Sequence, residues 1–237
     1  MTQLSYRPGD LDSVTPSIDR VDTRLRRDAV LQRAVLRDLE RLTSVLAGPV
    51  TAVRRSALIG HVTFLTVQLR RHWQVQDELL WPRAVAGDPS LAGAADRVRD
   101  SHRAAAAHCA TMVTTAQQWA VVGDAEHRLL VLDAVREMAD VLPAVFERDS
   151  DVSAPALGAL TGQDRAVVER GAARRRRPTA LARELFWLLD DLDPASAAAL
   201  LAGIPPLRMW VLRNGFSGAY NRGSYLMWVG GGLGVPV

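Results

Sequence analysis

The sequence contains no lysine, and all 29 of its basic residues are arginine. Alanine, valine and leucine dominate its apolar residues, so the arginine bias is typical of a GC-rich genome and does not by itself indicate a nucleic-acid partner. The 26 acidic residues leave a net charge of only +3, and the two signs alternate along most of the chain, as on solvated helix faces. We therefore expect no nucleic-acid binding.

Cysteine and long apolar runs are also scarce. The single cysteine, Cys109, cannot form an internal disulfide, which agrees with a reducing compartment. No stretch approaches the roughly 18–20 uninterrupted apolar residues that span a bilayer, and residues 1–17 are polar, without the apolar region of a signal peptide. We expect a cytoplasmic protein with no membrane partner.

Helical periodicity is the strongest positive signal. Apolar residues recur at positions i, i+3, i+4 and i+7 in four long segments, at about 21–46, 56–83, 91–121 and 125–152. The connections between these segments are short, which favours antiparallel neighbours. The pattern predicts an all-α protein: an up-down-up-down four-helix bundle, followed by a C-terminal helical extension. The sequence has no strand–helix–strand pattern and no glycine-rich phosphate loop, so nucleotide binding has no support.

The composition changes after Pro155, and this change sets the predicted domains. They are a flexible N-terminal segment (1–20), the bundle (21–157), the extension (158–229) and a flexible tail (230–237). Within the extension we expect helices at about 162–171, 179–189, 194–202 and 207–214, and an exposed linker at Arg174-Arg175-Arg176-Arg177. The aromatic residues of the extension could cover the mouth of the bundle or make a homodimer contact; they are Trp187, Trp210, Tyr220, Tyr225 and Trp228.

Polar side chains on the inward stripes of the predicted helices are the main anomaly. Burying one without a partner costs on the order of 1–3 kcal/mol. His72 and Gln76 are four residues apart and therefore neighbours on one helix face. His102 and Asp149 fall on the inward stripes of the third and fourth segments. The core of a helix bundle is where such side chains build metal sites.

One stretch of the chain combines histidines, an acidic pair and a Leu-Trp-Pro ending. It runs from His61-Val62-Thr63-Phe64 to His72-Trp73-Gln74-Val75-Gln76-Asp77-Glu78-Leu79-Leu80-Trp81-Pro82. It resembles the second helix of bacterial hemerythrin-like proteins, in which these features recur. Asp100-Ser101-His102 resembles the third-helix histidine of that family, and Phe186-Trp187-Leu188-Leu189-Asp190 resembles the appendage of some bacterial members. The resemblance covers most of the chain, from about Asp28 to Arg222.

Members of this family hold two non-heme irons with histidines and bridging carboxylates from all four helices. The resemblance implies that His72 and His102 are ligand histidines. It also implies that Gln32 replaces the first-helix histidine and that Gln76 replaces the second-helix glutamate. A neutral amide cannot supply the charge that a bridging carboxylate gives to paired irons. The family's pattern of ligands therefore appears degenerate in this sequence.

In the fourth helix, Val145 stands where the family has a histidine, and Asp149 where it has a glutamate. A conventional oxygen-carrying di-iron centre is not expected. His72, His102 and Asp149 could still bind one ion, because two histidines and one carboxylate suit non-heme iron(II) or zinc. The predicted function is binding of at most one iron, or of a small ligand, for oxygen, peroxide or nitric-oxide chemistry. The alternative is a metal-free scaffold for a protein partner, and whether the chain is an enzyme stays open.

A metal-free core would need other partners for these side chains. The two histidines could bond to Gln76 and Gln32, and burial as neutral imidazoles would lower their pKa values. Asp149, at a helix end, could instead face solvent or Arg148. Three further residues have structural interpretations: His61 and His127 as structural or pore-lining histidines, and Cys109 as a buried apolar residue.

Overall fold

The computed structural model describes residues 16–174, 178–190, 192–202, 204 and 206–229, and the regular elements in these ranges are all helical. The predicted all-α class is confirmed. Three predicted features lie outside the described residues: the flexible tail at 230–237, residues 1–15 of the N-terminal segment, and Arg175-Arg176-Arg177 of the linker. Residues 16–20, predicted to be flexible, belong to the first helix.

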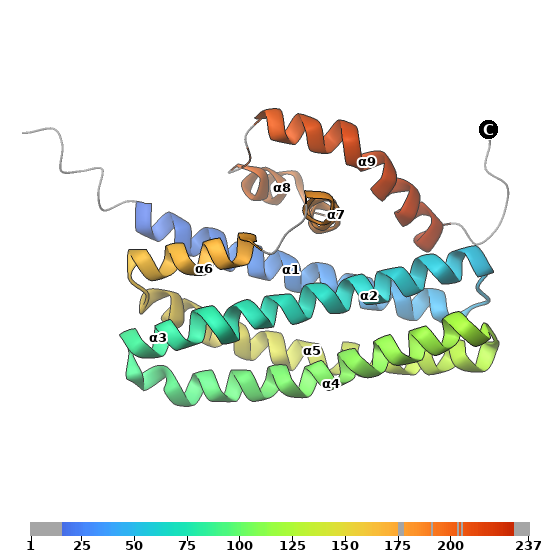
Figure 1. The fold of residues 1–237 in the computed structure, drawn as a ribbon, viewed down its shortest axis with the longest axis horizontal. Coiled ribbons are helices and arrows are strands. Elements are labelled where there is room, and N and C mark those ends of the chain that lie inside the picture. The colour runs from blue at the N-terminus through green and yellow to red at the C-terminus, as the bar shows by residue number, and fades with distance from the viewer. Residues whose placement is uncertain (1–15, 175–177, 191, 203, 205, 230–237) are drawn as a thin grey trace, which may run out of the picture.

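Four long helices lie side by side on one side of the molecule, and successive ones run in opposite directions (Figure 1). They are α1 (Pro16–Ala47), α2 (Ala52–Val75), α4 (Ala92–Val122) and α5 (Ala125–Gly158). Helix α5 packs against both α1 and α4, and α4 also packs against α2. Fully buried apolar residues such as Leu39, Leu65, Met112 and Met138 fill the space between them. The periodicity therefore located these four helices correctly along the chain.

Local sequence signals determine where the long helices begin and end. The hydroxyl of Thr51 caps α2 by accepting a hydrogen bond from the N–H of Arg54 (3.3 Å), and the carboxylate of Asp124 caps α5 by accepting from the N–H of His127 (2.8 Å). Gly123 adopts a left-handed conformation (φ 78°) and ends α4. These short connections make antiparallel neighbours of consecutive helices.

The second predicted segment is not one continuous α-helix. After α2, the chain forms a π-helical turn, η1 (Gln76–Leu80), and continues as α3 (Trp81–Gly87). The N–H of Trp81 donates to the carbonyl oxygen of Gln76, five residues earlier, so η1 is wider than a normal helical turn. A short 3-10 turn, η2 (Pro89–Leu91), then leads into α4.

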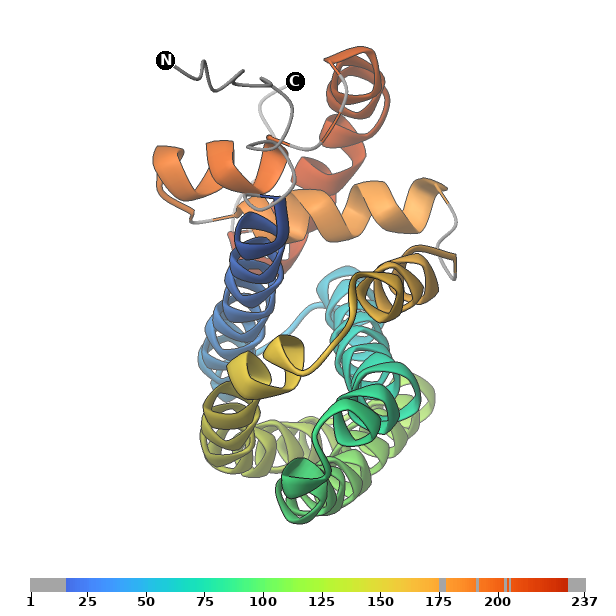
Figure 2. The same ribbon diagram turned by 90° about the vertical axis from the view of Figure 1, so that its left-hand side faces the viewer.

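The C-terminal third packs on α1 and α2, as the end-on view in Figure 2 shows. It consists of α6 (Gly162–Arg174), α7 (Pro178–Leu189), α8 (Pro194–Leu201) and α9 (Pro206–Trp228). Helix α6 contacts α2 and η1, α7 contacts α1, and α9 contacts α2 and α7. Trp187, Leu188 and Met227 join the main hydrophobic cluster of the long helices. Parts of α7 and α9 therefore share the core of the long helices, while Ala182 and Leu185 belong to a separate small cluster within the extension.

The last helix is longer than the sequence pattern indicated. It was predicted to end at about Asn214, but α9 continues to Trp228. Glycines at 215, 218 and 223 weaken its helical propensity. Packing outweighs this cost, because Met227 is buried, and Tyr220 and Trp228 pack on the hydrophobic cluster of the long helices.

Candidate functional site

Four of the five predicted site residues meet in the interior of the molecule. His72 comes from α2, Gln76 from η1, His102 from α4 and Asp149 from α5, and each is at most 7% exposed. Together with Asp28 and Asp77, described below, we call them the core cluster. The helical period predicted the inward direction of all four, and the antiparallel packing brings them to one place.

Asp149 lies between the two histidines. Its Oδ1 is 2.9 Å from Nε2 of His102, and its Oδ2 is 3.9 Å from Nε2 of His72. Oδ2 is buried and has no hydrogen-bond partner, which is unfavourable for a carboxylate oxygen. The suggestion that Asp149 faces solvent or Arg148 is wrong, because Asp149 is 1% exposed and the guanidinium of Arg148 donates to Ser101 (2.8 Å).

Gln76 is a direct neighbour of His72, as its spacing predicted. Its amide nitrogen lies 3.1 Å from Nε2 of His72, while its Oε1 is buried without a hydrogen-bond partner. Gln32, the fifth predicted site residue, is half-buried on α1. His102 is hydrogen-bonded to Asp77 and Asp149, so the prediction that the glutamines Gln76 and Gln32 are the partners of both histidines in a metal-free core is wrong for His102.

Two carboxylates that the sequence analysis did not single out lie against the outer nitrogens of the histidines. Oδ1 of Asp77 is 2.9 Å from Nδ1 of His102, and Oδ1 of Asp28 is 3.7 Å from Nδ1 of His72. Each imidazole therefore directs Nδ1 toward one of these carboxylates and Nε2 toward Asp149. Metal-binding histidines typically hold their second nitrogen on a carboxylate in this way.

Gln76 and its neighbour Asp77 both belong to the π-turn and both contact the cluster. Adjacent residues in an α-helix point about 100° apart, and these two contact different histidines. In η1, Gln76 contacts His72 on its own helix while Asp77 contacts His102 on α4. The acidic pair Asp77-Glu78 was visible in the sequence, but the α-helical period does not place Asp77 on the inward stripe.

The surroundings shift the two histidine pKa values in opposite directions. Burial lowers the pKa of His72, as predicted. Burial also acts on His102, but there the hydrogen bonds and charges of Asp149 and Asp77 outweigh it and raise the pKa to about 9. The predicted lowering is therefore wrong for His102, because its partners are carboxylates and not amides.

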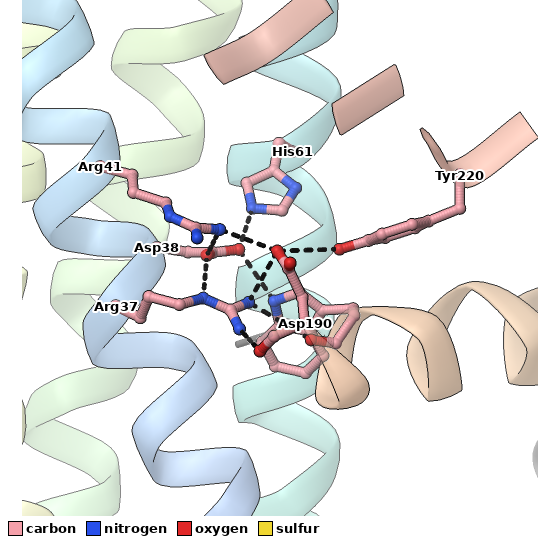
Figure 3. A network of polar contacts seen from close by, with 7 residues as sticks. Arg37, Asp38, Arg41, His61, Asp190 and Tyr220 are labelled. Atoms are coloured by element: carbon pink, nitrogen blue, oxygen red, sulfur yellow. Dashed lines mark hydrogen bonds and ion pairs between the residues drawn. The ribbon is translucent and has the colours of Figure 1, made fainter. Parts of the chain in front are cut away.

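A second buried polar network joins the extension to α1 and α2 (Figure 3). Oδ2 of Asp38 accepts a hydrogen bond from the indole N–H of Trp187 (2.8 Å) and lies 2.7 Å from Nε2 of His61. Oδ1 of Asp38 accepts from Nε of Arg37 (2.8 Å). Burial alone would raise the pKa of Asp38, but the hydrogen bonds and charges of His61 and Arg37 outweigh it and lower the pKa.

Asp190, at the end of α7, extends this network. Its carboxylate accepts from Arg41 (2.8 Å) and from the hydroxyl of Tyr220 (3.5 Å), and its carbonyl oxygen accepts from Arg37. We call the whole set the Asp38 network: Arg37, Asp38, Arg41, His61, Trp187, Asp190 and Tyr220. These contacts support the structural interpretation of His61.

The other residues singled out from the sequence have ordinary structural environments, as helix-end, buried apolar or exposed surface residues. His127 is half-buried at the start of α5, where its Nδ1 lies 2.7 Å from Asp124. Cys109 is fully buried, which confirms its interpretation as an apolar residue, and burial raises the pKa of its thiol to about 12. Val145 is buried among apolar residues of the main hydrophobic cluster. Of the aromatic residues of the extension, Trp187 and Trp228 face the long helices, whereas Trp210 and Tyr225 are exposed.

Within the described part of the chain, no group of three or more histidine, cysteine, aspartate or glutamate residues has the arrangement of a formed metal site. In the same residues, no helix has the length and apolar character needed to cross a membrane. No protein-family model matches the chain, and neither a curated protein nor a solved structure matches it.

Proposed function

We propose that the chain is a hemerythrin-like four-helix bundle protein whose core cluster binds one divalent metal ion, iron(II) or zinc. His72, His102 and Asp149 would hold the ion, with Gln76 beside them. The observation that carries the proposal is the common orientation of the two imidazoles. Nδ1 of each faces a carboxylate and Nε2 of each lies on the side of Asp149, where Nε2 of His72 also contacts the amide nitrogen of Gln76 (3.1 Å). A cation bound beside Asp149 could be reached by both Nε2 atoms once the Gln76 amide turns away.

The charge of the cluster supports a single ion. Among the described residues, the carboxylates of Asp28, Asp77 and Asp149 have one guanidinium in ion-pair range, that of Arg24, which lies 3.7 Å from Asp28. An ion bound to Nε2 of His102 would displace the proton there. With both imidazoles then neutral, the net charge of these groups is −2, which one divalent ion would balance. A second ion would need the bridging carboxylate that the neutral amide of Gln76 cannot provide.

Two buried oxygen atoms without partners also support a bound ion. Oδ2 of Asp149 and Oε1 of Gln76 are buried oxygen atoms without a hydrogen-bond partner, and both are oxygen ligands of a kind that metal ions accept. Two histidines and one carboxylate form the ligand set of non-heme iron(II) sites, which leave coordination positions open for oxygen, peroxide or nitric oxide. The protein's part would be to hold the ligands and exclude water, with Trp73 stacked on His102 (5.4 Å between ring centroids).

A metal-free scaffold is the second candidate, and one observation favours it. Both ring nitrogens of His102 already have carboxylate partners at 2.9 Å. A protonated His102 therefore satisfies Asp77 and Asp149 without any ion. In this case the long helices would serve to present a surface to a protein partner, and the cluster would only stabilise the fold.

Metal analysis separates the two candidates. Protein purified without chelator should hold up to one iron or zinc per chain, and the metal-free protein should take up one equivalent of iron(II) or zinc(II). His102→Gln should abolish this uptake. The matched control is His108→Gln, the same change on the same helix at a residue whose ring lies near Glu137 (3.6 Å) and outside the cluster. Two tightly held irons per chain would contradict the claim that Gln76 cannot replace a bridging carboxylate. If the wild type takes up no metal, the metal-free scaffold is the candidate that remains.

A further inference from the structure

We infer that Asp77 is a positioning residue for His102, which it holds so that Nε2 faces the metal position, and that Asp28 does the same more weakly for His72. The inference rests on the proposed function and names the residues that would set the affinity of the site. Neither aspartate is among the ligand residues predicted from the sequence.

Two contacts together restrict the ring of His102 to one orientation. The indole of Trp73 stacks on it with an angle of 20° between the ring planes, which fixes the plane of the imidazole. Within that plane, the contact of Nδ1 with Asp77 (2.9 Å) fixes the rotation, because a flipped ring would present a carbon atom to the carboxylate. The proton on Nδ1 then leaves the lone pair of Nε2 for a metal.

The backbone of η1 holds Asp77 in place. Asp77 lies in this π-turn and contacts His102 on α4, while the preceding residue, Gln76, contacts His72. π-turns inside helices occur frequently at functional sites. The turn here, at Gln76–Leu80, supplies a second contact to the cluster from adjacent positions in the chain.

Asp28 is placed less favourably. Its Oδ1 is 3.7 Å from Nδ1 of His72, beyond hydrogen-bond distance, and its other oxygen faces Arg24 at 3.7 Å. The guanidinium of Arg24 therefore draws on the same carboxylate. We expect His102 to be the firmly oriented ligand and His72 the less firmly oriented one.

The test compares Asp77→Ala with Glu78→Ala. Both changes remove one carboxylate from the same π-turn, but Glu78 is exposed and accepts a hydrogen bond from Gln74 (2.7 Å), outside the cluster. The side chain of Asp77 is 32% exposed, so alanine leaves no closed cavity there, and alanine favours helices. Far-UV circular dichroism and thermal melting of both variants check that the fold is kept.

Zinc affinity is measured by competition with a chromophoric chelator. Asp77→Ala should bind zinc roughly 10–100-fold more weakly than the wild type, and Asp28→Ala should lose less than Asp77→Ala. Glu78→Ala should bind like the wild type. In ¹⁵N-labelled, zinc-loaded wild-type protein, the ring nitrogens of His102 should show a protonated Nδ1 and a metal-bound Nε2, and in Asp77→Ala this pattern should weaken or reverse.

The outcomes distinguish a failure of the positioning role of Asp77 from a failure of the proposed metal-binding function. If the wild type binds zinc and Asp77→Ala binds it as tightly as Glu78→Ala, with unchanged ring nitrogen signals, the positioning role of Asp77 is wrong and the proposed function stands. If Asp28→Ala loses more affinity than Asp77→Ala, the assignment of the two roles is wrong. If the wild type binds neither zinc nor iron(II), the proposed function fails and this inference fails with it.

Discussion

Replacing Asp38 with asparagine should lower the free energy of unfolding by about 3 kcal/mol, although the two side chains have almost the same shape. Asp38 is 1% exposed and serves three donors: the indole N–H of Trp187, Nε2 of His61 and Nε of Arg37, at 2.7–2.8 Å. Asparagine removes the charge and presents an N–H₂ group where one of the two acceptor oxygens had been.

The magnitude follows from the bonds that are lost. A hydrogen bond to a charged group contributes about 1.5–3 kcal/mol. Arg37 loses little, because it also donates to the carbonyl oxygens of Trp187 (3.3 Å) and Asp190. His61 and Trp187 share Oδ2 of Asp38, whereas Arg37 donates to Oδ1. In asparagine, the N–H₂ group replaces either the acceptor of Arg37 or the shared acceptor of His61 and Trp187, and every remaining bond loses the charge. The loss of one to two such bonds gives about 3 kcal/mol, within the usual range for breaking a buried charged network.

Urea unfolding at pH 7 in the presence of a chelator measures this difference free of any metal effect. At roughly 2–4 °C per kcal/mol for a chain of this size, the melting temperature should fall by about 6–12 °C. The matched control is Asp133→Asn, the same change at a residue that is 65% exposed and forms an ion pair with Arg136 (3.7 Å). This control should change stability by less than about 0.5 kcal/mol.

The pH dependence adds a second readout. The pKa of Asp38 is lowered in the folded protein, so its contribution is complete above the unfolded value of about 3.9 and is lost as the pH falls through the folded value. The difference between wild type and Asp38→Asn should therefore be constant near neutral pH and shrink below about pH 4. A loss under 1 kcal/mol at pH 7 would refute the view that this network holds the extension to α1 and α2.

Two further predictions concern the core cluster. In metal-free protein, the raised pKa of His102 contributes stability that is complete below the unfolded value of about 6.5 and is lost as the pH rises through about 9. Melting temperatures measured in chelator should therefore fall between these pH values for the wild type and for His108→Gln, but not for His102→Gln. A flat wild-type profile would contradict the contacts of His102 with Asp77 and Asp149. The combined change Gln32→His, Gln76→Glu, Val145→His and Asp149→Glu should raise iron uptake, measured per chain after reconstitution, because it restores the histidines and carboxylates of the family pattern; a folded quadruple variant with no gain would mean that the alignment of the first and fourth helices is wrong.

The positions of the long helices and the inward direction of His72, Gln76, His102 and Asp149 could be predicted from the sequence. An apolar pattern with a period of 3.6 residues indicates which side of each helix is buried, and short capped connections make consecutive helices antiparallel. These two facts suffice to bring inward polar residues of different helices toward one axis. They also suffice for the burial of Cys109 and Val145.

The partners of those residues were decided only by the tertiary structure. The contacts of His72 with Asp28, His102 with Asp77 and Asp38 with Trp187 join residues 44, 25 and 149 positions apart, and they depend on the rotation and offset of one helix against another. Helical periodicity determines neither this rotation nor this offset. The π-turn at Gln76–Leu80 and the full length of α9 have the same origin, because in both cases packing between elements outweighs the local preference of the chain.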